Sequence, residues 1–281
     1  MTKSYQFGFN PNLPTKILRL LIKTIKVAFF LNFNNKFSNE FIQDLKISKK
    51  VTFDNKEIIF RTGHGRLDWR VKSFFKEEPL VIEWIKSFSK NDIFFDVGAN
   101  IGLYTLAALT KGAKVYAAEL DPKNVSILFE NLYLNKCFDE CILLPFALGE
   151  KNKIEKIFYR DFSEGDALQS IGKETKLPTV FGNKFNTRQI VFQIDKIFDI
   201  FNLNQPNKIK IDVDGNERLV FEGGGKIISN CKELYIEDNN LESDEFVKNF
   251  LKLNNFTEIK KHPINKPATN KFIYNRLYKK N

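Results

Sequence analysis

The residues of this chain best suited to hold a ligand lie in one short segment, Asp96-Val-Gly98-Ala-Asn100-Ile-Gly102. A largely apolar run, residues 93–97, leads into it and a stretch with helical spacing follows it, which indicates a turn between a buried strand and a helix. Glycine at position 98 permits a tight turn, and glycine at position 102 lets the helix approach a ligand and the sheet closely. Backbone N–H groups at such a turn favour an electron-rich ligand.

The turn departs from the dinucleotide-binding pattern G-x-G-x-x-G. Asn100 stands where the second glycine would be, and Leu103 stands where the third would be. This departure argues against a nicotinamide- or flavin-dependent enzyme without eliminating one. A glycine turn alone is weak evidence for any function, so the nearby carboxylates are the stronger indication of what the turn binds.

Two carboxylates belong to this region. Glu119 ends the next apolar run, 23 residues after Asp96, where a carboxylate accepts both hydroxyls of an adenosine ribose. The alternative for Glu119 is a solvent-facing side chain at the end of a strand. Asp96 either aims its carboxylate at a cationic part of the ligand or bonds the amides of the glycine turn, and the two roles are compatible.

Strands and helices alternate along the chain and must position these residues. A helix begins at Asp121-Pro122, where Asp is the expected N-cap and Pro the first helical residue, and another begins at Ser243. The alternation predicts an α/β fold: a Rossmann-like, mostly parallel sheet with helices on both faces, closed by a C-terminal antiparallel hairpin. The expected strands are residues 93–97, 115–118, 141–146, 154–160, 189–195, 208–213, 234–237, 256–261 and 271–278.

Outside the alternating region, the sequence predicts an N-terminal extension, residues 1–90, before a domain of residues 91–281. The extension combines a helix in 14–37, a hairpin at 51–61 and a helix at 76–89. Within 161–186, a long polar loop is typical of a lid, a binding loop or disorder. Glycines 223–225 are expected to bend or interrupt the helix after strand 208–213.

The helix in residues 14–37 is predicted to be amphipathic and basic, with four cations on one face. Such a helix either lies on an anionic membrane surface or packs against its own domain. Its charge-free run is too short to span a bilayer. The four cations are Lys16, Arg19, Lys23 and Lys26.

Five segments together resemble the FkbM family of S-adenosylmethionine-dependent methyltransferases: DVGANIGLYT, VYAAELDP, NLYLN, PFALGE and KIKIDVDGNE, in this order. The resemblance covers roughly residues 67–278. It implies an O-methyltransferase acting on sugars of surface polysaccharides, on their lipid-linked precursors, or on natural products. Two positions depart from the family pattern, since Asp214 stands where Glu is common and Leu120 where Pro is more frequent.

The resemblance also implies which residues hold S-adenosylmethionine. Residue Asn100 would support the glycine turn, and Ala147 with Leu148 would flank the adenine. The cofactor site would comprise Asp96, Gly98, Asn100, Gly102, Glu119, Leu120, Ala147, Leu148 and Asp212.

Asp212 is the predicted catalytic residue, because it ends the strand expected beside strand 93–97. Methyl transfer is an in-line displacement, so the enzyme must align the acceptor hydroxyl and remove its proton. The residue is interpreted as that base, or as the group that holds the acceptor hydroxyl or the cofactor amine. A strand-end Asp that bonds loop amides is the plain alternative.

Substrate contacts are predicted at five residues: His64, Asp68, Arg70, Asp214 and Glu237. The first three lie in a glycine-flanked segment, 63–70, interpreted as an exposed loop over the pocket. Oxygen ligands at Glu237, Asp238 and Asn239 make Mg²⁺ a candidate cofactor, although strand-end acidic residues are more often ordinary solvated groups, and no metal ligand is assigned.

Composition narrows the function classes. With 44 Lys and Arg against 34 Asp and Glu, the chain carries a net charge of +10, which suits an acidic partner or a solvated basic surface. Nucleic-acid methylation is a rival, but the Asn/Asp-Pro-Pro-Tyr/Phe motif for flipped bases is missing, so no specific nucleic acid is expected. Two His exclude a His-rich metal site, and three Cys with no visible signal peptide predict a cytoplasmic protein.

Overall fold

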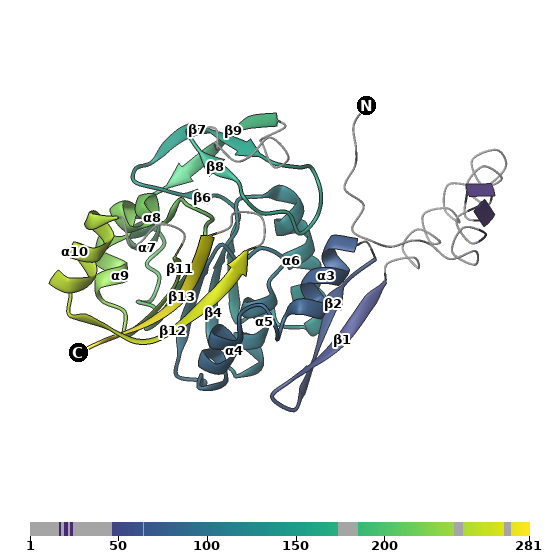
Figure 1. Ribbon diagram of the computed structural model, residues 1–281, viewed down its shortest axis with the longest axis horizontal. Helices are drawn as coiled ribbons and strands as arrows, with labels where there is room; N and C mark the ends of the chain where they lie inside the picture. The colour runs from purple at the N-terminus through teal and green to yellow at the C-terminus, as the bar shows by residue number, and fades with distance from the viewer. Residues whose placement is uncertain are drawn as a thin grey trace. The chain divides into compact units, whose positions relative to one another are not determined.

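The computed structural model describes residues 47–63, 65–173, 185–238, 244–266 and 271–281, together with Ile17, Leu20, Leu21, Lys23 and Thr24 (Figure 1). Side chains at 265, 266, 271 and 272 are not described. The chain divides into two compact units, residues 1–47 and 48–281. In the part of the chain that is described, no helix combines the length and apolarity needed to cross a bilayer.

A seven-stranded sheet forms the centre of unit 48–281, in the order β12-β13-β11-β10-β3-β4-β5. Strands β11, β10, β3, β4 and β5 run parallel, and β13 is antiparallel to β11 and to β12. The predicted fold class, a mostly parallel sheet closed by a C-terminal antiparallel pair, is confirmed. The strands are β3 Ile93–Val97, β4 Lys114–Ala118, β5 Cys141–Leu144, β10 Lys208–Ile211, β11 Glu233–Asp238, β12 Phe256–Lys266 and β13 Lys271–Lys280.

Helices cover both faces of this sheet, as alternation along the strands requires (Figure 1). Phe94 and Tyr235 point into one apolar core, which contains side chains of α4, α5 and α6. Phe95 and Ile236 point into the other, which contains side chains of α7 to α10. The helices are α4 Pro79–Lys86, α5 Leu103–Thr110, α6 Pro122–Asn135, α7 Ile194–Ile200, α8 Glu217–Gly223, α9 Gly225–Ser229 and α10 Glu245–Leu253.

Helix starts follow from local side-chain chemistry. Asp121 caps α6, its carboxylate accepting from Lys123 N, and Pro122 is the first helical residue, as predicted. The expected start of α10 at Ser243 is corrected: Asp244 is the N-cap and accepts from the amides of the first turn. Gly224 separates α8 from α9, so the expected interruption is confirmed.

The segment before the sheet packs on the same core as the sheet. Strands β1 Ser48–Phe53 and β2 Lys56–Arg61 form the predicted hairpin, and both turn residues, Asp54 and Asn55, have positive φ. Phe60 and Leu67 join the core that Phe94 occupies. Residues 48–90 are thus part of the larger unit, while a functional domain boundary at residue 90 stays a prediction.

Two further expectations about secondary structure were wrong. Segment 63–70 was expected to be an exposed loop, but α3 occupies Gly65–Ser73, because Leu67 and Val71 bury one face of a helix. Strand 189–195 was expected to run to Asp195, but it ends at Phe192 and α7 begins at Ile194.

Four strands form a second, separate sheet, in the order β6-β9-β7-β8. The sequence had not predicted this sheet. Its strands are β6 Ala147–Leu148, β7 Lys153–Tyr159, β8 Ser170–Ile171 and β9 Phe185–Phe192, and it lies near the top of the view in Figure 1. The sheet matters for function because the link from β7 to β8 reaches the carboxyl ends of the main strands.

Candidate active site

The glycine turn after β3 packs directly on the backbone that follows β10. Gly98 has φ +86°, and a Cβ built there would lie 1.9 Å from the carbonyl oxygen of Asp212. Only glycine fits this close approach. Gly102, also at positive φ, packs against a side chain instead: an added Cβ would lie 2.3 Å from Leu128 Cδ1 of α6. The turn therefore fixes the spacing between the end of β3 and Asp212.

Glu119 follows β4 directly and is bound to the glycine turn. Its Oε2 accepts from Asn100 N and its Oε1 from Asp121 N, both at 2.7 Å. The side chain is 7% exposed. Burial raises the pKa of Glu119 to about 7, although the two backbone donors oppose that shift. A carboxylate held this way keeps lone pairs that can accept further hydroxyl donors.

Behind the glycine turn, a buried lysine lies among carboxylates. Lys210 is a register neighbour of Asp96 on β3 and of Tyr235 on β11, and its Nζ lies 2.7 Å from Asp212 Oδ2. Burial alone would lower the pKa of Lys210, but the carboxylates of Asp212, Glu78 and Asp96 raise it above its usual value. The lysine is therefore a fixed positive charge under the strand ends.

Asp96 is completely buried at the end of β3. Its Oδ2 accepts from Thr105 Oγ1 at 2.7 Å, while Oδ1 has no hydrogen-bond partner among the described residues. Burial raises the pKa of Asp96, and Lys210 acts in the opposite direction. This orphaned oxygen is the kind of buried polar atom that a bound ligand or water satisfies.

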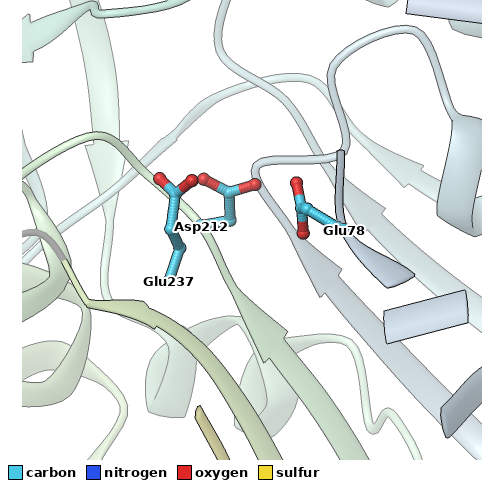
Figure 2. A group of neighbouring side chains, drawn as sticks. All are labelled: Glu78, Asp212 and Glu237. Atoms are coloured by element: carbon cyan, nitrogen blue, oxygen red, sulfur yellow. The ribbon is translucent and has the colours of Figure 1, made fainter. Parts of the chain in front are cut away.

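Three carboxylates come together beside Asp212. Figure 2 shows Asp212 between Glu237 at the end of β11 and Glu78, the residue before α4, and one oxygen from each lies within 4.8 Å of the others. Tyr235 Oη donates to Glu78 Oε2 at 3.3 Å. Among the residues predicted from sequence, Asp212 and Glu237 are thus brought together as expected, and Glu78 joins them.

The described part of the long loop, residues 161–173, is fastened over the glycine turn. Asn100 Nδ2 and Asn124 Nδ2 both donate to the Asp166 carbonyl, at 2.8 and 2.9 Å. Leu168 N donates to Asp214 Oδ2 at 2.9 Å. These three bonds hold residues 166–168 beside the glycine turn, and Asp214 supplies one of them.

A buried carboxylate anchors the same loop from within. The Asp166 side chain is fully buried and accepts from the guanidinium groups of Arg66 on α3 and Arg160 after β7. Arg70 Nε, also on α3, donates to the carbonyl oxygen of Gly165 at 2.6 Å. Helix α3 thus holds this loop in place through Arg66 and Arg70.

Other predicted residues lie in several places. Asp68 Oδ1 accepts from Gly63 N at 3.4 Å on α3, and His64 lies outside the described residues. Leu120 and Ala147 belong to the small core beneath the second sheet, next to the Glu119 end of β4. Leu148 instead packs into the core of α7 to α10.

Sequence reasoning missed Glu78, Lys210 and Asp166. Lys210 carried a visible signal, because a lysine that alternates with two isoleucines in a buried strand points to the other face, here toward Asp212. Glu78 and Asp166 carried none, since their distance along the chain from the other site residues hides the contact.

A hollow of about 440 Å³ lies away from these residues, lined by α10 and by residues of β12 and β13. It is lined by Lys248, Leu251, Lys252, Asn255, Phe256, Thr257, Tyr278 and Asn281. None of the predicted site residues contributes to it, so the strand-end cluster remains the candidate site on chemical grounds.

Comparison with known proteins places the chain among methyltransferases. A hexuronic acid methyltransferase, AglP of Haloferax volcanii, is 22% identical over 172 residues, 60% of this chain and 65% of that protein. A tRNA (guanine(37)-N(1))-methyltransferase of Dictyostelium discoideum is 30% identical over 116 residues, 41% of this chain and 22% of that protein. The match spans less than two-thirds of either relative.

Among solved structures, the chain is similar to a tRNA m1G37 methyltransferase of M. jannaschii, with a TM-score of 0.45 and 14% identity over 84% of this chain and 55% of that one. A precorrin-6y C5,15-methyltransferase of Geobacter metallireducens gives a TM-score of 0.45 at 11% identity, over 75% of this chain and 92% of that one. The family model described as "Methyltransferase FkbM domain" matches residues 96–261, which is more than half of the chain. The protein therefore belongs to the FkbM methyltransferase family, as its sequence motifs had indicated.

Proposed function

We propose that this protein is an S-adenosylmethionine-dependent O-methyltransferase that modifies a sugar hydroxyl of a surface polysaccharide or of its lipid-linked precursor. The observation that carries the proposal is that Glu119 and Asp212 both contact the glycine turn, Glu119 through Asn100 N and Asp212 through Gly98. Glu119 is suited to bind a ribose, and Asp212 is suited to bind a hydroxyl acceptor. A small-molecule natural product is the alternative acceptor. Membership of a methyltransferase family supports the reaction type.

The residues present fit the cofactor. Glu119 offers buried carboxylate oxygens at the end of β4, where a ribose diol is bound in folds of this type. The Asp96 Oδ1 orphan lies under the same turn and could accept from a polar group of the ligand. When bound, S-adenosylmethionine supplies an electrophilic methyl group, and the methyl–sulfur bond breaks with its electron pair going to sulfur.

Asp212 acts on the acceptor hydroxyl. Its carboxylate positions the hydroxyl in line with the methyl group and takes up the proton as the new oxygen–carbon bond forms. Alignment supplies up to about 7–11 kcal/mol, and a positioned base about 10²–10⁴-fold in rate. Because Lys210 Nζ holds Oδ2, Asp212 is a weak but well-fixed base, so alignment contributes the larger share.

The sugar acceptor is suggested by the name of one relative, the hexuronic acid methyltransferase AglP. Carboxylate side chains such as Asp212 and Glu237 are common acceptors for sugar hydroxyls, since each offers several lone pairs. A cytoplasmic location, with residues 14–37 resting on an anionic membrane, would place the enzyme beside a lipid-linked precursor. All but five of those residues lie outside the described part of the chain.

Methylation of RNA is the second candidate, because the net charge is +10 and the comparisons include tRNA methyltransferases. A gel-shift titration with tRNA distinguishes the two. Binding that weakens steeply with salt and methyl incorporation into tRNA would favour RNA. Methyl incorporation into glycan alone would favour the sugar acceptor.

The test of the main proposal is mass spectrometry of glycans from cells with and without the gene, which should differ by one methyl group. In vitro, Asp212→Ala should lower turnover by about 10²-fold or more while binding of S-adenosylmethionine changes little. The matched control is Asp199→Ala, an exposed carboxylate on α7, which should keep full activity. Full activity in Asp212→Ala, or tight binding of NAD in place of S-adenosylmethionine, would refute the proposal.

A further inference from the structure

We propose that Glu78, Asp212 and Glu237 bind a divalent cation of the Mg²⁺ or Mn²⁺ class, which holds the oxygen of the methyl acceptor. The cation site itself is independent of the acceptor's identity, while its role in catalysis rests on the proposed methyl transfer. Glu78 and Asn275, the neighbour of Glu237 on β13, do not belong to the site predicted from sequence.

The geometry of the three carboxylates suits a hard cation. One oxygen from each lies within 4.8 Å of the others, and the side chains converge from three separate elements (Figure 2). Glu237 is 4% exposed, and Glu78 and Asp212 are half-buried. Carboxylates this close in a partly buried site repel one another strongly. Oxygen donors of this kind favour Mg²⁺ or Mn²⁺ over softer metals.

An independent observation comes from β13. Asn275 lies opposite Glu237 in the antiparallel register, so both side chains are on the same face of the sheet. The side chain of Asn275 is completely buried, and neither Oδ1 nor Nδ2 has a hydrogen-bond partner among the described residues. A buried amide without hydrogen-bond partners is destabilising, and a ligand or its bound water would supply the missing bonds.

The series of side chains in register, Glu237 and Asn275, continues onto β12. His262 is opposite Asn275 in register, and its Nδ1 is also buried without a partner among the described residues. Asp212, Glu237, Asn275 and His262 therefore follow one another across the carboxyl edge of the sheet on one face. Asn275, which neighbours Glu237 directly, is thus the unsatisfied buried side chain that a hydrated ion at the acidic cluster would reach, and His262 lies one strand further out.

The site leaves room for an acceptor. Mg²⁺ takes six oxygen ligands and usually keeps several waters, so three carboxylates leave positions that an acceptor oxygen can occupy. A cation there would orient that oxygen and make its proton easier to remove, so that a weakly basic carboxylate such as Asp212 is sufficient to accept the proton. Lys210, beneath Asp212, keeps the inner side of the cluster positively charged.

The experiment measures Mn²⁺ binding to the full chain by the loss of the free-ion electron paramagnetic resonance signal, after EDTA treatment and gel filtration. Wild type should bind one Mn²⁺ per chain with a dissociation constant at or below about 1 mM, and Mg²⁺ should compete. Glu237→Gln and Glu78→Gln should each weaken binding by about tenfold or more, and Asn275→Leu by a smaller factor. Glu77→Gln is the matched control, since it makes the same change at the neighbouring exposed residue.

Each sample is also tested for folding by circular dichroism and for binding of S-adenosylmethionine. If Glu237→Gln does not fold, Glu78→Gln decides, because that side chain precedes a helix and is only half-buried. No saturable Mn²⁺ binding up to about 5 mM, or equal affinity in Glu77→Gln and both site variants, would overturn the cation site. Intact S-adenosylmethionine binding in that case leaves the proposed function standing. Full methyl transfer in excess EDTA would overturn the role given to the cation.

Discussion

The ammonium group of Lys210 lies 2.7 Å from Asp212 Oδ2, and the lysine side chain is 1% exposed. Lys210 lies on β10 in register with Asp96 and Tyr235, and Asp212 follows the end of that strand two residues later. A buried charge pair of this kind is costly to break from one side, because the remaining charge stays in a poorly solvated place. The pair thus links fold stability to the predicted catalytic carboxylate.

Replacing Lys210 by Met should lower the free energy of unfolding by about 3 kcal/mol or more, because the carboxylates of Asp212 and Asp96 lose the lysine ammonium group that offsets their charge. Urea unfolding followed by circular dichroism measures this change. Lys226→Met is the matched control: Lys226 is 63% exposed and pairs with Asp199 on the surface, so we expect a change within about 0.5 kcal/mol. Equal effects of the two substitutions would contradict the importance assigned to the buried pair.

Gly98→Ala should destabilise the protein by about 4 kcal/mol or more and abolish cofactor binding. The new methyl group would lie 1.9 Å from the Asp212 carbonyl oxygen, so β3 and β10 would have to separate. Thermal unfolding and calorimetry with S-adenosylmethionine measure both effects.

Gly215→Ala separates this clash from backbone strain. Gly215 also has positive φ, but apart from its two chain neighbours no atom of the described residues lies within 4 Å of its added Cβ. The cost there should be limited to about 1 kcal/mol of conformational strain. If the two alanine variants were equally stable, the contact between Gly98 and Asp212 would not govern the turn.

Cofactor affinity should increase as the pH rises through about 7, because burial raises the pKa of Glu119 to about 7 and only the carboxylate accepts both ribose hydroxyls. Calorimetric titration with S-adenosylmethionine between about pH 6 and about pH 8 tests this. Glu119→Gln should bind about tenfold or more weakly and lose the pH dependence. An unchanged affinity in Glu119→Gln would exclude the residue from the cofactor site.

The same group sets a stability trend of opposite sign. The pKa of Glu119 rises from its usual value of 4.5 to about 7 on folding. Between these values the unfolded chain loses the proton while the folded chain keeps it, so unfolding becomes easier as the pH rises through that window and levels off above it. In urea unfolding, Glu119→Gln should show a smaller decline across the window than wild type.

Binding to anionic vesicles should depend on the four cations of the predicted N-terminal helix. Flotation with phosphatidylserine-containing liposomes should recover wild type, and changing all four to Ala should reduce recovery severalfold, since each contributes about 1 kcal/mol. The four are Lys16, Arg19, Lys23 and Lys26.

The control for vesicle binding removes the same charge from exposed positions elsewhere. It replaces by Ala the residues Lys114, Lys151, Lys196 and Lys252. Recovery equal to wild type is expected for this variant. Equal recovery of both four-site variants would show that the N-terminal cations have no special role.

The sequence by itself determined the elements and their class. Apolar runs bounded by turn residues located β3, β4, β5, β10 and β11, and Asp121-Pro122 located the start of α6, because buried strands and helix caps depend on nearby residues. The glycine turn, Glu119 and Asp212 were found for the same reason, since each lies directly after a strand. The family motifs added the reaction type, which no periodicity contains.

Tertiary structure alone decided which distant residues meet. Glu78 joins Asp212 and Glu237 only because α4 packs on the sheet, and Asn275 reaches Glu237 only through the register of β13. Arg66 reaches Asp166 from α3, which is a helix rather than the expected loop. Contacts of this kind depend on how helices and strands pack and in which order the strands lie, and the spacing of residues within one element does not reveal them.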